Sequence, residues 1–316
     1  MLPSVLQRRT TDHIPVLADE VRRLVAVQPG ETVVDATFGA GGHALLLAAD
    51  LQARGRYIAI DRDPTVQPYF DGFKRQFGSL QPRLLRGEFS NVLDGLASNG
   101  VEADVVLLDL GVSSMQLDLP ERGFSYATDA PLDMRMDPSG ELTASDLVNG
   151  ESERELATVF KRYGEERYAR QIARAIVRRR PLDSTGELVE VIKSAIPAPA
   201  RFGEGHPAKR VFQALRIAVN DELGALERAL PAVFEMLRPG GRLAVISFHS
   251  LEDRIVKNFM REGERGCTCP PDFPVCICGN EPVLRALSRR PLRPTEDEVA
   301  HNPRAASARL RVAVKV

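Results

Sequence analysis

Hydrophobic and polar positions follow two alternating periods along residues 20–112, which predicts a β/α rhythm there. Short, near-continuous apolar runs give way to segments whose apolar positions recur with helical spacing. Runs of this kind are typical of a parallel sheet covered by helices on both faces. The predicted strands are "ETVVDATF", "GRYIAIDRD", "PRLLRGEF" and "ADVVLLDLGV", and the predicted helices are "HALLLAADLQ" and "SNVLDGLASNG".

The same rhythm resumes near residue 207. "AKRVFQALRIAVNDELGALERALPAVFEML" predicts one long or broken helix, which "RPGG" ends as a turn and stop signal. "RLAVISF" predicts a fifth strand, "SLEDRIVKNFMRE" a helix and the alternating "ASARLRVAVKV" a last strand. The intervening residues are loop-rich and then helical. We therefore expect a discontinuous α/β domain (1–113 and 207–316) with an inserted helical subdomain (114–206), which is a candidate RNA-binding surface.

Composition narrows the class of protein. Hydrophobic residues make up 43% and charged residues 27% of the chain, as in ordinary globular proteins. No apolar run is long enough to cross a bilayer, and the first fifteen residues lack the apolar stretch of a secretory signal. We therefore expect a cytoplasmic protein with no membrane partner. The net charge is −1, so binding to a nucleic acid would require a local basic surface.

The stretch "VVDATFGAGGHALLLA" (33–48) joins a strand to a helix through a glycine turn, which is typical of a nucleotide site. A P-loop would need Lys and Ser/Thr after the last glycine, but His43 and Ala44 follow here. The dinucleotide fingerprint tolerates Ala44 as its third small residue, so NAD is not excluded by spacing. Asp35 ends the strand just before the turn. Its charge would repel a pyrophosphate and attract the ammonium and sulfonium groups of S-adenosylmethionine.

Two further acids end predicted strands. Asp61 closes the second strand, where a carboxylate can accept both ribose hydroxyls of either cofactor. Asp109 closes the fourth, so it shares a sheet edge with Asp35 and Asp61, and ligands of open α/β sheets bind at that edge. Three acids and a glycine turn favour S-adenosylmethionine over NAD. Phe89, after the third strand, has two open interpretations: stacking on adenine or packing in the core.

Several unusual sequence blocks occur in a fixed order. They are "DATFGAGGH", "AIDRDP", "LLDLGVSSMQLD", "ERGFSY", "PLDMRMD", "FQALRIAVNDEL", "GGRLAVISFHSLEDRIVKNF" and "NPRAASARLRV". From about His13 to Val314 the chain resembles the ribosomal RNA small subunit methyltransferase H family, also called MraW. The resemblance implies a class I S-adenosylmethionine-dependent methyltransferase fold, which is Rossmann-like and mostly parallel. It also implies methylation of a cytidine N4 in the decoding region of 16S rRNA; whether the substrate is naked rRNA or the small ribosomal subunit, which we favour, is open.

The resemblance also implies a set of cofactor contacts: Gly41, Gly42, His43, Asp61, Phe89, Asp109 and Gln116. The residue pattern indicates Asp61, Phe89 and Asp109 independently, whereas His43 and Gln116 rest on the resemblance. Related amino-methyltransferases carry Asp/Asn-Pro-Pro-aromatic after the fourth strand, where this chain has Asp109-Leu-Gly-Val-Ser-Ser. We expect Asp109 to be the catalytic residue. Whether it binds the cofactor, the target amine or both is open, and backbone carbonyls of its loop would share the task.

Three other polar residues each have two interpretations. His249, after the fifth strand, either contacts the target cytosine or its phosphate, or caps the next helix alongside Ser250; the cap is favoured. Asn220 in "RIAVNDEL" either faces the target base or caps a kink in the helix, and both remain open. His43 is more typical of a residue that packs at a helix start than of a base.

Basic residues concentrate in the insert. Residues 161–180 hold eight basic and two acidic side chains. Arg170, Arg174 and Arg178 recur every four residues and would form one stripe on a helix, which Arg179 and Arg180 extend. This stripe is either a solvated helix face or a phosphate contact, and the local charge imbalance favours the phosphate contact. A base within folded RNA must be extruded before its amino group can react, and the insert offers a surface for this.

All four cysteines fall within twelve residues, "CTCPPDFPVCIC". Cys267, Cys269, Cys276 and Cys278 form two Cys-x-Cys pairs, whereas the usual zinc knuckle is Cys-x-x-Cys. They indicate either a tetrahedral zinc site or free thiols on a surface excursion. A metal here would be structural, because methyl transfer to an amine does not need one.

Two alternative functions remain. One is another nucleotide-dependent enzyme on a Rossmann-like sheet, such as an NAD oxidoreductase, which would bind NAD rather than S-adenosylmethionine. The other is a non-catalytic RNA-binding module, which would transfer no methyl group.

Overall fold

The computed structural model describes residues 15–316 apart from residues 53, 202–205, 268 and 270–277. The chain forms two compact units. The first comprises the chain up to Gly111 and from Gly224 onward, and the second is Val112–Leu223. None of the helices in the described ranges is both long and apolar enough to span a membrane.

The first unit is built on one mixed sheet of seven strands. They are β1 (Thr32–Asp35), β2 (Arg56–Asp61), β3 (Arg83–Arg86), β4 (Ala103–Asp109), β5 (Leu237–Ser247), β6 (Leu284–Ala286) and β7 (Arg309–Lys315). The spatial order is β3-β2-β1-β4-β5-β7-β6. Strands β1 to β5 are mutually parallel, and β7 runs antiparallel to β5 and β6. The predicted class I methyltransferase fold is confirmed. The three-residue β6 was not predicted, because so short a strand has no recognisable period.

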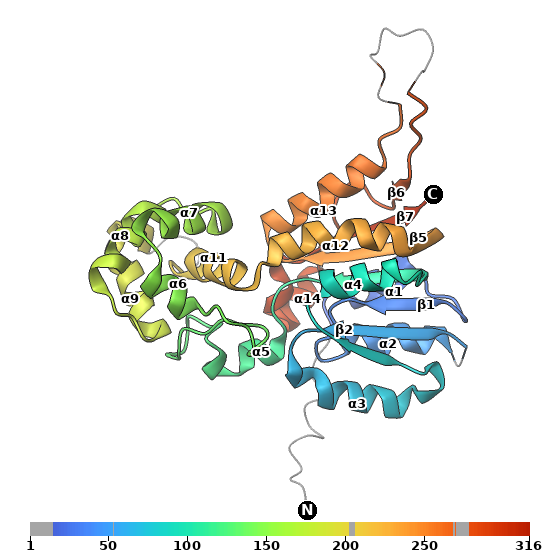
Figure 1. Ribbon diagram of the computed structural model, residues 1–316, viewed down its shortest axis with the longest axis horizontal. Helices are drawn as coiled ribbons and strands as arrows, with labels where there is room; N and C mark the ends of the chain where they lie inside the picture. Colours follow the sequence, from blue (N-terminus) through green and yellow to red (C-terminus); the bar gives the residue numbers. More distant parts are fainter. Residues whose placement is uncertain (1–14, 53, 202–205, 268, 270–277) are drawn as a thin grey trace, which may run out of the picture. The chain divides into compact units, whose positions relative to one another are not determined.

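Helices cover both faces of this sheet (Figure 1). One face packs against α4 (Phe89–Ser98), α12 (Glu222–Met236) and α13 (Ser250–Gly263) through a buried apolar cluster. The other face carries α2 (Gly42–Leu51) and α3 (Gln67–Gln76), and α1 (Ala18–Val25) contacts α2. Both faces are therefore buried, which explains the near-continuous apolar runs of the strands.

Backbone geometry corrects two sequence-based boundaries and shows which form the predicted long helix takes. The third strand ends at Arg86, because Glu88 already caps α4 by accepting a hydrogen bond from Ser90 N. The predicted long or broken helix is a broken one: α11 (Lys209–Asn220) and α12 are separated by Asp221 in the left-handed region. "RPGG" lies within β5, where the register against β4 shifts.

The second unit is helical. Its helices are α5 (Ser114–Asp118), α6 (Ala144–Gly150), α7 (Glu153–Gly164), α8 (Ala169–Arg179), α9 (Thr185–Ala195), α10 (Ala198–Arg201) and α11. They enclose an apolar core of their own, which includes Leu156, Phe160 and Ile172. α11 belongs to this unit, although sequence analysis assigned it to the α/β domain. It packs closely against α7 at Gly164, where a Cβ would lie 2.4 Å from the Arg210 carbonyl oxygen.

Candidate active site

Asp35, the first of the three acids at the carboxyl edge of the sheet, is buried and accepts hydrogen bonds from two neighbouring residues. The Tyr57 hydroxyl donates to its Oδ2 at 2.9 Å, and Thr37 N donates to its Oδ1 at 3.2 Å. Burial raises the pKa of Asp35 to about 6, and these two hydrogen bonds oppose that rise. Each carboxylate oxygen thus accepts one hydrogen bond from inside the protein, and Asp35 is only 1% exposed. Because so little of this side chain is accessible, an effect of Asp35 on a ligand would act through its charge.

Asp61 holds the glycine turn. Its Oδ2 accepts a hydrogen bond from Gly39 N at 2.8 Å, and its Oδ1 accepts one from Asp63 N at 2.9 Å. A carboxylate has about four acceptor positions, so both oxygens keep capacity for further donors such as ribose hydroxyls. Burial raises the pKa of Asp61, and the two amide hydrogen bonds partly offset this.

The turn requires its glycines at the start of α2. Gly41 precedes the helix with φ +80°, a left-handed conformation that L side chains rarely adopt. A Cβ on Gly41 would lie 3.0 Å from the Phe38 ring, and one on Gly42 would lie 3.2 Å from Pro15. The backbone of the turn is therefore wound tightly, with the first amides of α2 next to it.

Asp109 and His43 meet at the same edge. Asp109 Oδ2 lies 3.6 Å from His43 Nε2, and Thr37 Oγ1 accepts the Asp109 backbone N–H at 2.6 Å. Among the described residues, Asp109 Oδ1 and both ring nitrogens of His43 are buried without a hydrogen-bond partner. Buried polar groups in native proteins are almost always paired. This edge is therefore a place where a ligand with hydrogen-bond donors would be stabilised.

Burial sets the protonation of this pair. It raises the pKa of Asp109 to about 8, and the nearby carboxylates of Asp35 and Glu252 add to the rise. Burial lowers the pKa of His43 to about 4. At neutral pH His43 is neutral and Asp109 is largely a carboxylic acid. A cation placed here would favour the ionised carboxylate.

Phe89 and His249 each follow a strand of the sheet in the chain: Phe89 comes after β3 and His249 after β5. Phe89 is the first residue of α4, half-buried, and packs against the apolar cluster that α4 shares with α12 and α13. His249 is the N-cap of α13: its Nδ1 accepts from Glu252 N at 3.4 Å, and Glu252 Oε2 accepts from His249 N at 3.2 Å. The helix-capping interpretation of His249 is confirmed.

Gln116 lies in the second unit, where it closes a capping box at the start of α5. Its Oε1 accepts from Ser113 N at 3.0 Å, and its own N–H donates to Ser113 Oγ at 3.3 Å. A cofactor contact through Gln116 stays a prediction.

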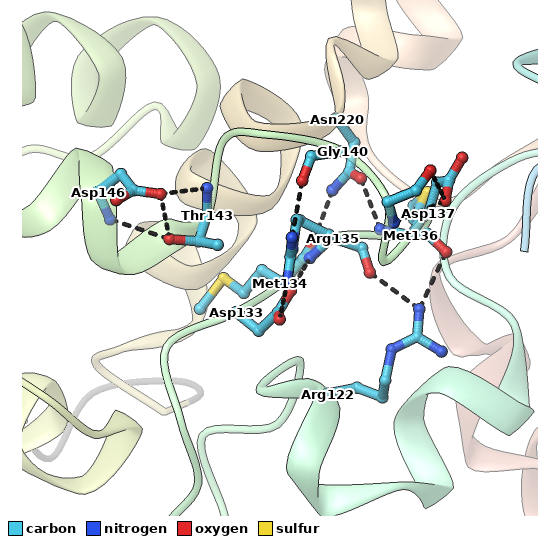
Figure 2. Close-up of polar contacts among 11 residues, drawn as sticks. Arg122, Asp133, Met134, Arg135, Met136, Asp137, Gly140, Thr143, Asp146 and Asn220 are labelled. Atoms are coloured by element: carbon cyan, nitrogen blue, oxygen red, sulfur yellow. Dashed lines mark hydrogen bonds and ion pairs between the residues drawn. The ribbon is translucent and has the colours of Figure 1, made fainter.

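Asn220, at the end of α11, holds the loop that contains "PLDMRMD" (Figure 2). Its Oδ1 accepts from Met136 N at 2.7 Å, and its Nδ2 donates to Met134 O at 2.7 Å and to Arg216 O at 2.9 Å. Arg122 reinforces the loop by donating to the carbonyls of Arg135 and Met136, both at 2.9 Å. Sequence reasoning missed this clamp, because the loop lies more than eighty residues from Asn220 in the chain.

The basic stripe lies on the exposed side of α8. Arg170, Arg174 and Arg178 are exposed, whereas the opposite side of the helix is buried in the core of the second unit. Arg174 Nε lies 3.2 Å from Glu153 Oε1 in an exposed pair of the kind that contributes little to stability. Arg180 does not extend the stripe, because it donates to the carbonyls of Val148 and Glu151.

The described thiols come together after α13. The Sγ atoms of Cys267, Cys269 and Cys278 all lie within 4.8 Å of one another. Cys276, the fourth cysteine of the predicted cluster, lies outside the described residues.

Comparison with known proteins identifies the family. Residues 10–316 match the model of the MraW methylase family. The chain is 53% identical over 309 residues to Ribosomal RNA small subunit methyltransferase H of Heliobacterium modesticaldum, an alignment that covers 96% of this chain and 98% of that one. It is 52% identical to the protein of the same name from Symbiobacterium thermophilum, with 96% of each chain covered. Among solved structures it is similar to TrmN from Thermus thermophilus, with 13% identity, a TM-score of 0.42, and 95% of this chain and 48% of that one covered. Because the family match spans nearly the whole chain, the protein belongs to the MraW methylase family of methyltransferases.

Proposed function

We propose that the protein uses S-adenosylmethionine to methylate the exocyclic N4 of a cytidine in the decoding region of 16S rRNA. The single observation that carries the proposal is the Asp109–His43 pair beside a tight glycine turn, whose buried polar atoms find no partner in the part of the chain that the structure describes. Family membership supports methyl transfer, and relatives more than half identical are named for the small-subunit ribosomal RNA. The enzyme would act in the cytoplasm, on rRNA within the small subunit.

The residues fit the proposed cofactor. The tight backbone at Gly41 and Gly42 would admit its amino-acid part, and the remaining acceptor capacity of Asp61 suits two ribose hydroxyls. The half-buried Phe89 ring would lie by the adenine, and Gln116 completes the set that the family resemblance implies. The cofactor supplies the methyl group. Asp109 and His43 would form hydrogen bonds with polar groups of the cofactor near its sulfonium and with the target amine.

Methyl transfer to cytosine N4 has two requirements, and Asp109 would meet the second. Cytosine N4 is a poor nucleophile, because its lone pair is delocalised into the ring. The nitrogen must be held in line with the methyl group and the sulfur, and positioning accounts for much of such a rate enhancement. An acceptor must also take a hydrogen bond from the amino group as the nitrogen rehybridises. Asp109 Oδ1, which has no partner among the described residues, is the proposed acceptor.

Transfer of tritium from labelled S-adenosylmethionine tests the proposal. Label should enter small-subunit particles, or 16S rRNA freed of protein, and nucleoside analysis should place it in N4-methylcytidine. Label in another nucleoside would refute the assignment of N4. Absence of transfer to both substrates, with cofactor binding intact, would favour the non-catalytic module. Binding of NAD in place of S-adenosylmethionine would favour the other enzyme class.

Cofactor binding is expected to release about one proton between about pH 6 and pH 7.5. In the free protein the pKa of Asp109 is about 8, so the carboxyl is mostly protonated in this range. A cationic ligand would favour the carboxylate, so affinity should rise with pH by up to about tenfold per unit. Calorimetry in two buffers of different ionisation enthalpy measures the released proton. Identical enthalpies in both buffers would contradict the prediction, and the Asp109→Asn protein, which has no proton to release, is the control.

Charge reversal of the α8 stripe is expected to weaken RNA binding. The double variant Arg170→Glu/Arg174→Glu should lower the slope of log affinity against log salt by about two, because each lost phosphate contact removes roughly one released counterion. The control is Lys74→Glu/Arg75→Glu on the exposed surface of α3, which changes the net charge equally. Salt titrations of binding to 16S rRNA decide the matter. Equal losses in the two double variants would show that total charge matters rather than the stripe.

A further inference from the structure

Three cysteine side chains converge in the excursion between α13 and β6. The Sγ atoms of Cys267 and Cys278 are 3.7 Å apart, and Cys269 Sγ lies within 4.8 Å of both. A disulfide would bring two sulfurs to about 2.05 Å, so no disulfide joins Cys267 and Cys278. Thiolates around a tetrahedral zinc, with Zn–S of about 2.3 Å, lie about 3.8 Å apart. The Cys267–Cys278 distance therefore matches two corners of such a site.

The neck of the excursion holds these thiols near one another. Val283 N donates to Gly263 O at 2.8 Å, and Ala286 N donates to Glu264 Oε1 at 2.8 Å. The end of α13 and the start of β6 pack so closely that a Cβ on Gly263 would lie 2.6 Å from Leu284 Cδ1. Cys267 and Cys278 stand only a few residues beyond this closure, so much of the entropy cost of bringing them together is already met.

The cluster lies at the opposite sheet edge from Asp109. Helix α13 starts just after the carboxyl end of β5 and runs fourteen residues, about 21 Å, back along the sheet. The returning β6 pairs Leu284 with Lys315 of β7, and the adjacent Val314 pairs with Arg242 on the amino-terminal side of β5. A metal ion at the thiols would be remote from the carboxyl edge and would act on structure, not on methyl transfer.

We propose that Cys267, Cys269 and Cys278 are ligands of a structural zinc ion. Sulfur ligands select soft or borderline metals, and Zn²⁺ in particular, over Mg²⁺ and Ca²⁺. Binding would deprotonate the three thiols and release their protons, with no change of oxidation state. The ion would cross-link the outgoing segment, at Cys267 and Cys269, to the returning segment, at Cys278, just beyond the neck of the excursion.

Metal analysis of the full chain, purified under reducing conditions without chelator, tests this site. About one zinc per chain is expected. Cobalt(II) added to the zinc-free protein should give the near-ultraviolet charge-transfer band of thiolate ligation. The single variants Cys267→Ser, Cys269→Ser and Cys278→Ser should each lose most of the zinc and weaken the band. The control Glu281→Ser alters an exposed residue of the same excursion and should keep both.

Three results would overturn the proposal. They are reduced protein that takes up neither metal, a Cys→Ser variant among the three that keeps full zinc and the full cobalt band, and a Cys267–Cys278 disulfide as the only change the thiols undergo. Calorimetry with S-adenosylmethionine separates this site from the proposed function. Zinc removal should leave cofactor affinity unchanged, and a parallel loss of affinity would contradict the placement of the site away from the cofactor.

Discussion

Replacement of Asp109 by Asn is expected to reduce methyl transfer by about two to four orders of magnitude, the usual contribution of a positioned acid–base group. The side chains have nearly the same shape, so the change removes charge and acceptor strength without opening a cavity. The introduced amide would still lie near His43, but it cannot become an anion beside a cationic cofactor. Single-turnover transfer of labelled methyl groups measures the loss separately from cofactor binding.

The same substitution is expected to stabilise the protein free of ligand, and the gain should grow with pH. The pKa of Asp109 is about 8 in the folded protein, against about 3.9 for an unfolded Asp. Between these values the folded state binds one more proton than the unfolded state, so the contribution of Asp109 to the free energy of unfolding falls as pH rises. The Asn variant escapes this loss. Its Tm should exceed that of the parent by more at pH 8 than at pH 5.

A matched control separates this effect from a general loss of negative charge. Asp94→Asn makes the same change on the exposed surface of α4. It should leave both methyl transfer and the pH dependence of Tm unchanged. If the Asp109 variant keeps full activity, Asp109 is not the acceptor. If its Tm advantage is the same at both pH values, Asp109 is not a partly buried acid with a raised pKa.

The sequence predicted the parts of the site that depend on local pattern. Asp35, Asp61 and Asp109 end apolar runs, and parallel strands necessarily bring such ends to one edge. The protonation of Asp109 could not be read from the sequence. It depends on burial and on Asp35 and Glu252, which three separate segments of chain bring together. His43 entered the set through the family resemblance alone, because a histidine after a glycine turn has no distinctive pattern.

The second unit was harder to predict for the same reason. The helical period of α7 and α8 was clear, but the assignment of α11 depends on its close packing against Gly164. Phe89 is the last residue of "PRLLRGEF", which the sequence pattern predicts to be a strand, but β3 ends at Arg86. Only the cap formed by Glu88 makes it the first residue of α4. Sequence pattern thus specified elements and their ends, whereas contacts between distant segments decided which element belongs to which unit.

Asn220→Ala is expected to lower the free energy of unfolding by about 3–5 kcal/mol, because two buried backbone groups lose their partners. Met136 N–H and Met134 C=O both bond to the Asn220 side chain, and neither bond faces solvent. Each unsatisfied buried group costs about 1–3 kcal/mol. Met134 is also fully buried with φ 61°, a conformation that surrounding contacts must hold. Urea denaturation of the full chain, followed by a probe of the second unit, measures the change.

Asn99→Ala is the matched control for this substitution. Asn99 also stands at a helix end and donates to the carbonyl four residues before it, as Asn220 does, but its bond is exposed. The control therefore loses the helix-end bond alone, and the cost should be below about 1 kcal/mol. A cost at Asn220 no greater than that at Asn99 would show that the loop is held by its other contacts, such as those of Arg122. A large difference would identify Asn220 as the residue that fixes "PLDMRMD" in its strained conformation.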